Sequence, residues 1–354
     1  MVKIPLSNLH ENDDFVLLMS PSSFQLDESL IHAVQTNLKD SSTSSLNWEP
    51  IVHGGSDREF YRVRSSNGKS WIVMRYSKER EENSLYVKVA GFMREIHLNV
   101  PEVVFHDEVL CLIILEDLGN INLYQIVRDP NSSKARVESL YQAALNQAQV
   151  LHQYKEASIP LMKGFDEKLY HWERTYFLEN LVARWADISI EPSRLAALEF
   201  EGEKMVSELM KQPRGLIHRD FQSQNLVVRD QTVWLIDFQG MRLGHAAYDV
   251  ASLLYDPYVN LDDSQRTSLL KFYIASAKKN QEEFQDQFDR AAIQRLMQAL
   301  GAYGYLGLVK QKQDFLKYIA PGLDRLAEVL TRLSGMEQML FLTLECKEKC
   351  RQKV

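Results

Sequence analysis

The feature that most constrains the fold of this chain is a polar loop followed by a short apolar hairpin. The loop contains Asp220 and, five positions later, Asn225. Asp237 lies seventeen positions after Asp220, at the end of the second apolar run. β-Branched apolar segments on either side of a polar turn predict two paired strands. We expect these strands at residues 226–228 and 233–236.

Two carboxylates and an amide in this order suit phosphoryl transfer, which requires an oriented nucleophile and metal ions that neutralise the phosphates. Asp220 would orient an acceptor hydroxyl and take its proton. Asp237 would chelate Mg²⁺, and the amide oxygen of Asn225 could complete the metal site. His218 is predicted to pack under the loop as a structural residue. An isolated His-Arg-Asp is common by chance, whereas the full pattern through Asp-Phe is restrictive.

These motifs resemble those of the aminoglycoside phosphotransferase and choline kinase group, the small-molecule branch of the protein-kinase-like fold. Asp237 is followed by Phe-Gln instead of the Phe-Gly usual in protein kinases. Residues 244–254 resemble the Gly-x-x-x-x-Asp-x-Ala segment of the group, in which the acid at Asp249 braces the catalytic loop. An ordinary helix N-cap is the alternative for Asp249. The resemblance implies ATP and Mg²⁺ as cofactors and a small-molecule hydroxyl as acceptor.

The resemblance also implies an α+β, bilobal fold with a small β-rich N-lobe and a larger, mainly helical C-lobe. We divide the chain into an N-terminal helical extension and linker (1–47), the N-lobe (48–118) and the C-lobe (119–354). In the first two segments we expect helices at 27–38 and 81–96 and strands at 48–52, 59–64, 70–76, 103–106 and 110–115. In the C-lobe we expect helices at 137–154, 265–278, 291–308 and 322–349. The aromatic-rich stretch 165–185 is predicted to be core, although some of its rings could line an acceptor pocket.

The nucleotide site is expected in the N-lobe. Gly54, Gly55 and Ser56 occupy the place of the phosphate-covering loop of kinase-like folds, and glycine N–H groups can approach phosphate oxygens closely. Arg75 stands where such enzymes usually carry a Lys that contacts phosphates, and its planar fork also suits phosphate oxygens. Its partner would be Glu82 on the following helix. A turn and a surface arginine are the plainer alternatives.

Residues 112–119 resemble the hinge between the lobes of the family. There an adenine would hydrogen-bond to backbone groups between Glu116 and Leu118. The alternative is an edge strand followed by a turn.

Within the group, the chain most resembles bacterial phosphotransferases that act on the anomeric hydroxyl of N-acetylmuramate and N-acetylglucosamine. The matching stretches include 115–119, 218–225, 237–239, 248–254 and 293–301. Arg75-Tyr76 is a departure, because those kinases often show an acidic residue and Ala-Pro there. Two alternatives stay open: a choline, amino-alcohol or aminoglycoside kinase, whose cationic acceptor needs an aromatic or acidic pocket, and a non-catalytic nucleotide-binding protein. The latter is disfavoured because all three polar residues of the site are present.

Composition narrows the class further. A chain of 354 residues can form two lobes. A net charge of −7 argues against nucleic acid as the main partner. No apolar run approaches the length needed to span a bilayer, and the first one, 15–19, is too short for a signal peptide. With only three cysteines a disulfide framework is not expected, so we place the protein in the cytoplasm.

Overall fold

The computed structural model describes residues 28–38, 46–51 and 58–353. The expected glycine turn at Gly54, Gly55 and Ser56 lies outside the described residues. So does most of the expected N-terminal extension.

The N-lobe is built on one antiparallel sheet of five strands in the order β1-β2-β3-β5-β4. The β2–β3 hairpin turns at Asn67-Gly68, where Gly68 has a φ of 87°, a conformation that glycine adopts at no steric cost. The strands are β1 Leu46–Ile51, β2 Glu59–Ser65, β3 Ser70–Arg75, β4 Val103–Asp107 and β5 Leu112–Glu116. The predicted sheet is therefore confirmed to within a few residues.

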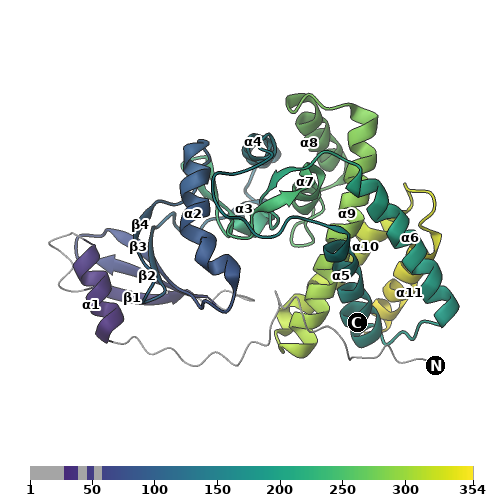
Figure 1. Ribbon diagram of the computed structural model, residues 1–354, viewed down its shortest axis with the longest axis horizontal. Coiled ribbons are helices and arrows are strands. Elements are labelled where there is room, and N and C mark those ends of the chain that lie inside the picture. The colour runs from purple at the N-terminus through teal and green to yellow at the C-terminus, as the bar shows by residue number, and fades with distance from the viewer. Residues whose placement is uncertain (1–27, 39–45, 52–57, 354) are drawn as a thin grey trace.

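One helix covers each face of this sheet (Figure 1). Side chains alternate along a strand, so neighbours such as Val73 and Met74 point to opposite faces. Val73 packs with α1 (Glu28–Asn37) in a small separate core. Met74 packs with α2 (Glu81–Glu95) in the large core that continues into the C-lobe. The two lobes thus share a core on the α2 side of the sheet.

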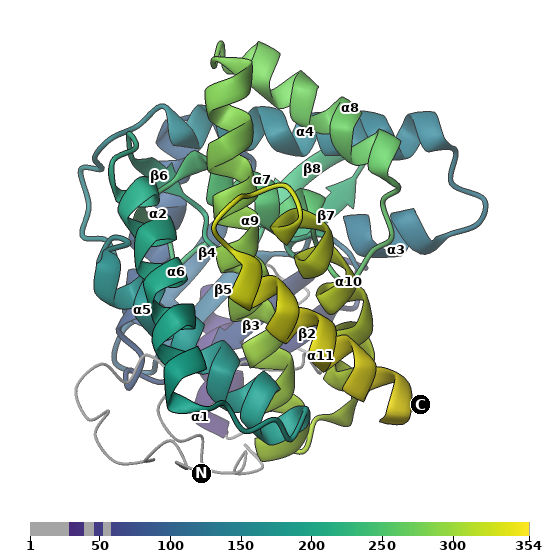
Figure 2. The same ribbon diagram turned by 90° about the vertical axis from the view of Figure 1, so that its right-hand side faces the viewer.

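The C-lobe is mainly helical, with α9 (Gln281–Gly304) running through its middle. Figure 2 shows α5 and α6 on one side of α9 and α10 and α11 on the other. The remaining helices are α3 Leu123–Arg128, α4 Lys134–His152, α5 Glu167–Phe177, α6 Pro192–Met210, α7 Ala246–Leu254, α8 Asp263–Ser276, α10 Ile319–Leu330 and α11 Glu337–Lys353. Two small strand pairs lie among them: β6 Gly215–Ile217 with β9 Arg242–Gly244, and β7 Leu226–Arg229 with β8 Thr232–Leu235.

Two helix predictions need correction: the helix expected at 291–308 begins ten residues earlier, at Gln281, and the helix expected at 322–349 is divided. The single helix expected at 322–349 is two helices, α10 and α11, because the chain turns between them and Gly335 adopts a φ of 80°. The aromatic stretch 165–185 begins its helix only at Glu167 and continues as a wider π-helical turn, Leu178–Trp185. At that turn α9 approaches very closely, since a Cβ added to Gly304 would lie 2.4 Å from the backbone oxygen of Asn180.

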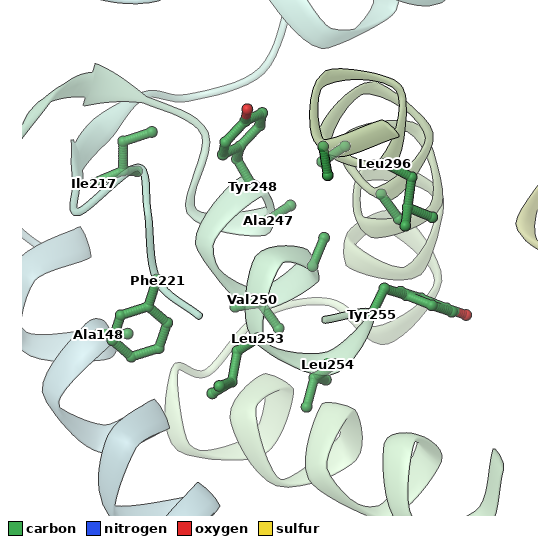
Figure 3. Close-up of a cluster of buried hydrophobic side chains, with 14 of the residues drawn as sticks. Ala148, Ile217, Phe221, Ala247, Tyr248, Val250, Leu253, Leu254, Tyr255 and Leu296 are labelled. Atoms are coloured by element: carbon green, nitrogen blue, oxygen red, sulfur yellow. The ribbon is translucent and has the colours of Figure 1, made fainter. Parts of the chain in front are cut away.

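The polar loop of the opening motif rests on a buried apolar cluster (Figure 3). Phe221 follows Asp220 directly and is fully buried. Its ring lies near Ala148 of α4 and Val250 and Leu253 of α7 (Figure 3). Burial of an aromatic side chain contributes roughly 1.5–3 kcal/mol, so this residue anchors the loop to the helices beneath it.

Candidate active site

The loop before β7 is braced by one carboxylate. Asp249 Oδ2 accepts hydrogen bonds from the backbone N–H of His218 (2.7 Å) and from Nε2 of His152 (3.0 Å). Its Oδ1 accepts from the N–H of Arg219 at 2.9 Å. The N-cap of α7 is His245, so Asp249 binds the loop and is not a helix cap. His218 Nε2 in turn donates to the carbonyl of Ile236, directly before Asp237, at 3.1 Å.

A second buried acid supports the loop from the other side. Asp256 Oδ2 accepts from both the N–H (2.9 Å) and the hydroxyl (2.5 Å) of Ser223. Its backbone carbonyl accepts from the guanidinium of Arg325 on α10. The loop is therefore fixed at both ends by carboxylates that bind its backbone.

The three polar residues of the motif come together as predicted from their spacing. Asn225 Nδ2 donates to the backbone carbonyl of Asp220 at 2.9 Å. The N–H of Ile236 donates to the carbonyl of Asn225 at 3.0 Å, which places Asp237 next to that amide. Arg219 and Asp237 have left-handed backbones, with φ of 78° and 62°. Such strained conformations cluster at functional sites.

Asp237 is paired with an arginine that the motif did not reveal. Arg58, directly before β2, donates from Nη2 to Asp237 Oδ1 at 2.6 Å, and the arginine side chain is 8% exposed. Gln239 Nε2 donates to the same oxygen at 2.9 Å. Burial raises the pKa of Asp237, but the Arg58 charge and these hydrogen bonds outweigh it and hold the pKa well below its ordinary value. Asp237 is thus kept ionised.

These residues fit a Mg²⁺ ion. The Asn225 amide gives its N–H to Asp220, so its carbonyl oxygen is left as a hard ligand. Both hydrogen bonds to the Asp237 carboxylate reach Oδ1, which leaves Oδ2. Mg²⁺ is usually held by one or two protein oxygens, with phosphate oxygens and water completing its shell. Within 28–38, 46–51 and 58–353, no group of three His, Cys, Asp or Glu residues could hold a metal ion.

Arg75 and Glu82 are not brought together. Arg75 ends β3 opposite Glu59 and shares the face of Val73, the one that α1 covers. There its charge partly offsets the burial that raises the pKa of Glu59. Because α2 packs on the opposite face, against Met74, Glu82 lies on the other side of the sheet. Contact between Arg75 and a phosphate stays a prediction.

Glu82 instead joins α2 to the catalytic loop. Its carboxylate lies 3.7 Å from Nη1 of Arg219 and 3.9 Å from Nη1 of Arg80. Arg219 Nη1 is also 3.7 Å from the carboxylate of Asp220. The loop is therefore tied through its own arginine to the N-lobe helix.

The segment between the lobes is held by two arginines. Arg62 of β2 forms a buried two-point pair with Asp117 at 2.7 and 3.0 Å. Glu116 pairs with Arg229 of the β7–β8 hairpin at 2.7 Å, which crosses from one lobe to the other. Among the described residues the backbone N–H of Leu118 has no hydrogen-bond partner, so it is free for the adenine contact expected there.

Beside Asp220 lies a pocket of about 120 Å³. Gln222 of the loop, Tyr258, and residues of α9 and the turn after it form the rest of its wall. The α9 contributions are Arg295, Gln298, Ala299, Ala302 and Tyr303, followed by Leu306. The aromatic rings of 165–185 do not line it, and Phe165, Tyr170 and Phe177 are buried core. Its position at Asp220 makes this pocket the candidate acceptor site.

Comparison with known proteins decides the family. A model of the phosphotransferase enzyme family matches residues 47–298. The chain belongs to this phosphotransferase family. It is 24% identical over 306 residues to the N-acetylmuramate/N-acetylglucosamine kinase of Pseudomonas aeruginosa, covering 82% of this chain and 88% of that kinase. A kinase of the same name from Caulobacter vibrioides is 26% identical over 262 residues, covering 70% and 68% of the two chains.

Two solved structures show the same fold. A choline kinase from Cryptosporidium parvum matches with a TM-score of 0.61 and 13% identity, over 90% of this chain and 98% of that one. The ADP-bound aminoglycoside phosphotransferase APH(2'')-Ib matches with a TM-score of 0.59 and 16% identity, over 86% and 99%. The predicted bilobal kinase-like fold is confirmed. No helix within the described part of this phosphotransferase is long and apolar enough to cross a membrane.

Several site residues were not predicted from the sequence. Most of them lie far along the chain from the motif they serve. Asp117 falls within 115–119 and Arg295 and Gln298 fall within 293–301, two stretches that resemble the sugar kinases, and this resemblance was the available signal. These residues are Arg58, Arg62, Asp117, His152, Asp256, Arg295 and Gln298.

Proposed function

We propose that this phosphotransferase moves the γ-phosphoryl of Mg-ATP to a hydroxyl of an amino sugar, the anomeric hydroxyl of an N-acetylmuramate or N-acetylglucosamine type of compound. One observation carries the proposal: Asp220 lines a polar pocket on one side and is linked through Asn225 to Asp237 on the other. This juxtaposition suits an acceptor hydroxyl beside a metal-bound phosphate. The names of the relatives support the sugar.

Each residue has a defined role in this proposal. Asp220 orients the acceptor hydroxyl and accepts its proton as the new bond to phosphorus forms. Asn225 and Asp237 would hold Mg²⁺, which when bound neutralises charge on the β- and γ-phosphates. The Leu118 N–H and the carbonyl of Glu116 would receive the adenine. Asp249 and Asp256 keep the loop that carries Asp220 in one conformation.

The second candidate is a kinase for choline or an aminoglycoside, which the solved neighbours favour by fold alone. Such an acceptor carries an ammonium group and is best bound by acidic or aromatic walls. Two tyrosines, Tyr258 and Tyr303, line the pocket, while Asp220 is its single acidic residue.

The experiment is a panel assay of ADP release with ATP and Mg²⁺. The acceptors are N-acetylmuramate, N-acetylglucosamine, choline, ethanolamine and kanamycin. We expect turnover with the acetylated sugars, abolished by EDTA, and a product whose reducing end is blocked by phosphate. Turnover confined to choline, ethanolamine or kanamycin would assign the second candidate instead.

A further inference from the structure

The acceptor pocket contains a buried arginine that forms no direct ion pair among the described residues. Arg295 on α9 is 9% exposed, yet no carboxylate of the described residues forms an ion pair with it. Its Nε donates to the hydroxyl of Ser252 at 3.0 Å. Its Nη2 donates to Oε1 of Gln222 at 3.2 Å, and its Nη1 donates to Oε1 of Gln298. Burying a guanidinium is costly, and the nearby carboxylates of Asp220 and Glu173 favour its charged form.

This arginine also sets the direction of two amides. A guanidinium has only donors, so Gln222 and Gln298 must both turn their carbonyl oxygens toward it. Their NH₂ groups then face away from Arg295, and in the described part of the chain neither has a hydrogen-bond partner. Of the five N–H donors of Arg295, three are used and two are left.

One part of the pocket wall is therefore rich in hydrogen-bond donors, while Asp220 supplies acceptor oxygens elsewhere in the pocket. Gln222, Arg295 and Gln298, which we call the donor cluster, all line the same pocket as Asp220. Carbonyl and carboxylate oxygens complement such a wall. An ammonium group placed against the donor cluster, and not against Asp220, would lie near a buried positive charge in a site of low dielectric, where like charges repel strongly.

We infer that the donor cluster selects the acceptor: it binds the acyl carbonyl or carboxylate oxygens of an N-acylated sugar and rejects compounds with a free ammonium group. The inference rests on the proposed function, because it takes the pocket beside Asp220 as the acceptor site. It adds that specificity is set by Arg295 through the glutamines that it orients. Glucosamine, which differs from N-acetylglucosamine only by its free amine, is the decisive poor substrate.

The test compares kcat/KM for N-acetylmuramate, N-acetylglucosamine and glucosamine in the full-length protein and in Q298E. Glutamate keeps the size of Gln298 and can still accept from Arg295, so the fold should hold, but it removes an NH₂ donor and supplies a negative charge. We expect KM for the acetylated sugars to rise about tenfold or more, because the variant loses one hydrogen-bond donor and places a negative charge against the acyl or carboxylate oxygens. The preference over glucosamine should fall by a similar factor.

R295M provides the second arm. It should weaken the binding of both acetylated sugars. A larger loss of affinity for N-acetylmuramate would identify its carboxylate as the group bound, whereas an equal loss for the two sugars would identify the acyl carbonyl. Unchanged KM values and an unchanged preference in a folded Q298E protein would overturn the inference. So would wild-type preference for glucosamine, choline or kanamycin.

Binding measurements separate this inference from the proposed function. Calorimetric titration with each sugar, in the presence of a non-hydrolysable ATP analogue, reports on the donor cluster without turnover. Binding of N-acetylglucosamine that is stronger than that of glucosamine and weakened by Q298E supports the donor cluster even if no sugar is phosphorylated. Absence of any such preference in binding would overturn it.

Discussion

Asp220 is positioned through its backbone, which leaves its carboxylate available for chemistry. Its carbonyl accepts from Asn225, and its neighbours His218 and Arg219 are fixed by Asp249. The carboxylate itself is close only to Arg219, at 3.7 Å, among the described ion pairs. A change confined to the side chain should therefore leave the loop intact.

We expect D220N to lower kcat by about 10²- to 10⁴-fold, the usual contribution of a general base. Nucleotide affinity, measured by calorimetry, should change little, because the metal ligands are untouched. Turnover that persists at the wild-type rate would remove Asp220 from its assigned role.

Arg58 is a residue whose importance only the structure reveals. It is the buried cation beside Asp237, whereas Arg64, on the β2 strand that follows Arg58, is 43% exposed and pairs with Glu49 at the surface. We expect R58A to raise KM for Mg-ATP by about tenfold or more, because it removes a charge-assisted contact in the nucleotide site. R58K should restore part of this loss.

R64A is the matched control for R58A, since exposed ion pairs contribute little. Its KM for Mg-ATP should stay within about twofold of the wild type. Equal effects of R58A and R64A would show that the pairing with Asp237 has no part in nucleotide binding.

At the scale of elements, three C-lobe helices meet at one buried carboxyl. Glu173 of α5 accepts hydrogen bonds from the hydroxyl of Tyr248 on α7 (2.9 Å) and from Nε2 of Gln294 on α9 (2.8 Å). Burial raises the pKa of Glu173 from its ordinary value of 4.5 to about 7, although both hydrogen bonds oppose the rise. Between pH 4.5 and about 7, the folded protein therefore keeps a proton on Glu173 that the unfolded chain has released.

A raised carboxyl pKa stabilises the fold fully below pH 4.5, and this contribution is lost as the pH rises through about 7. The difference is on the order of 3 kcal/mol. E173Q cannot titrate, so its free energy of unfolding should fall less than that of the wild type between pH 5 and 8. Urea denaturation across this range measures the effect, and parallel pH profiles for the two proteins would contradict it.

The elements show where sequence reasoning succeeds and where it stops. The β7–β8 hairpin was predictable because its strands and its polar turn, at Asp230 and Gln231, are adjacent in sequence. The same holds for Asp220, Asn225 and Asp237, which local spacing alone brings together. Arg295 was not predictable as a pocket residue, because its place beside Gln222 depends on how α9 packs under the loop. Long-range packing of this kind leaves no local pattern.

At the scale of the whole molecule, the lobes are joined by hydrogen bonds to β8 of the β7–β8 hairpin. Asn99 lies between α2 and β4. Its backbone carbonyl accepts a hydrogen bond from the N–H of Leu235 at 2.8 Å, and its side-chain amide donates to the backbone carbonyl of Val233 at 3.2 Å. Gln147 of α4 completes the junction, accepting from the N–H of Asn99 (2.9 Å) and donating to Val233 (2.6 Å). Together with the core shared on the α2 side, this makes the lobes one cooperative unit.

Gln147 tests that junction. Q147A leaves the N–H of Asn99 without its partner, so the free energy of unfolding should fall by about 1–3 kcal/mol. KM for ATP should also rise about two- to tenfold, because the placement of the N-lobe over the hairpin loosens. Chemical denaturation and steady-state kinetics measure the two effects.

Q149A is the control on the same helix. Gln149 donates to the carbonyl of Ser276 at 2.7 Å, a contact within the C-lobe. The Q149A protein should lose some stability but keep the wild-type KM for ATP. If Q147A and Q149A alter KM equally, the junction does not control the alignment of the lobes.

The left-handed backbone of Asp237 decides how its charge can be studied. At a φ of 62° an alanine is strained, while asparagine is among the few residues that adopt this conformation readily. An alanine variant would thus combine loss of the proposed metal ligand with a distorted turn, and its inactivity would be uninterpretable. Asparagine isolates the electrostatic contribution. The backbone conformation at Asp237 therefore makes asparagine, and not alanine, the substitution that tests the charge of this residue.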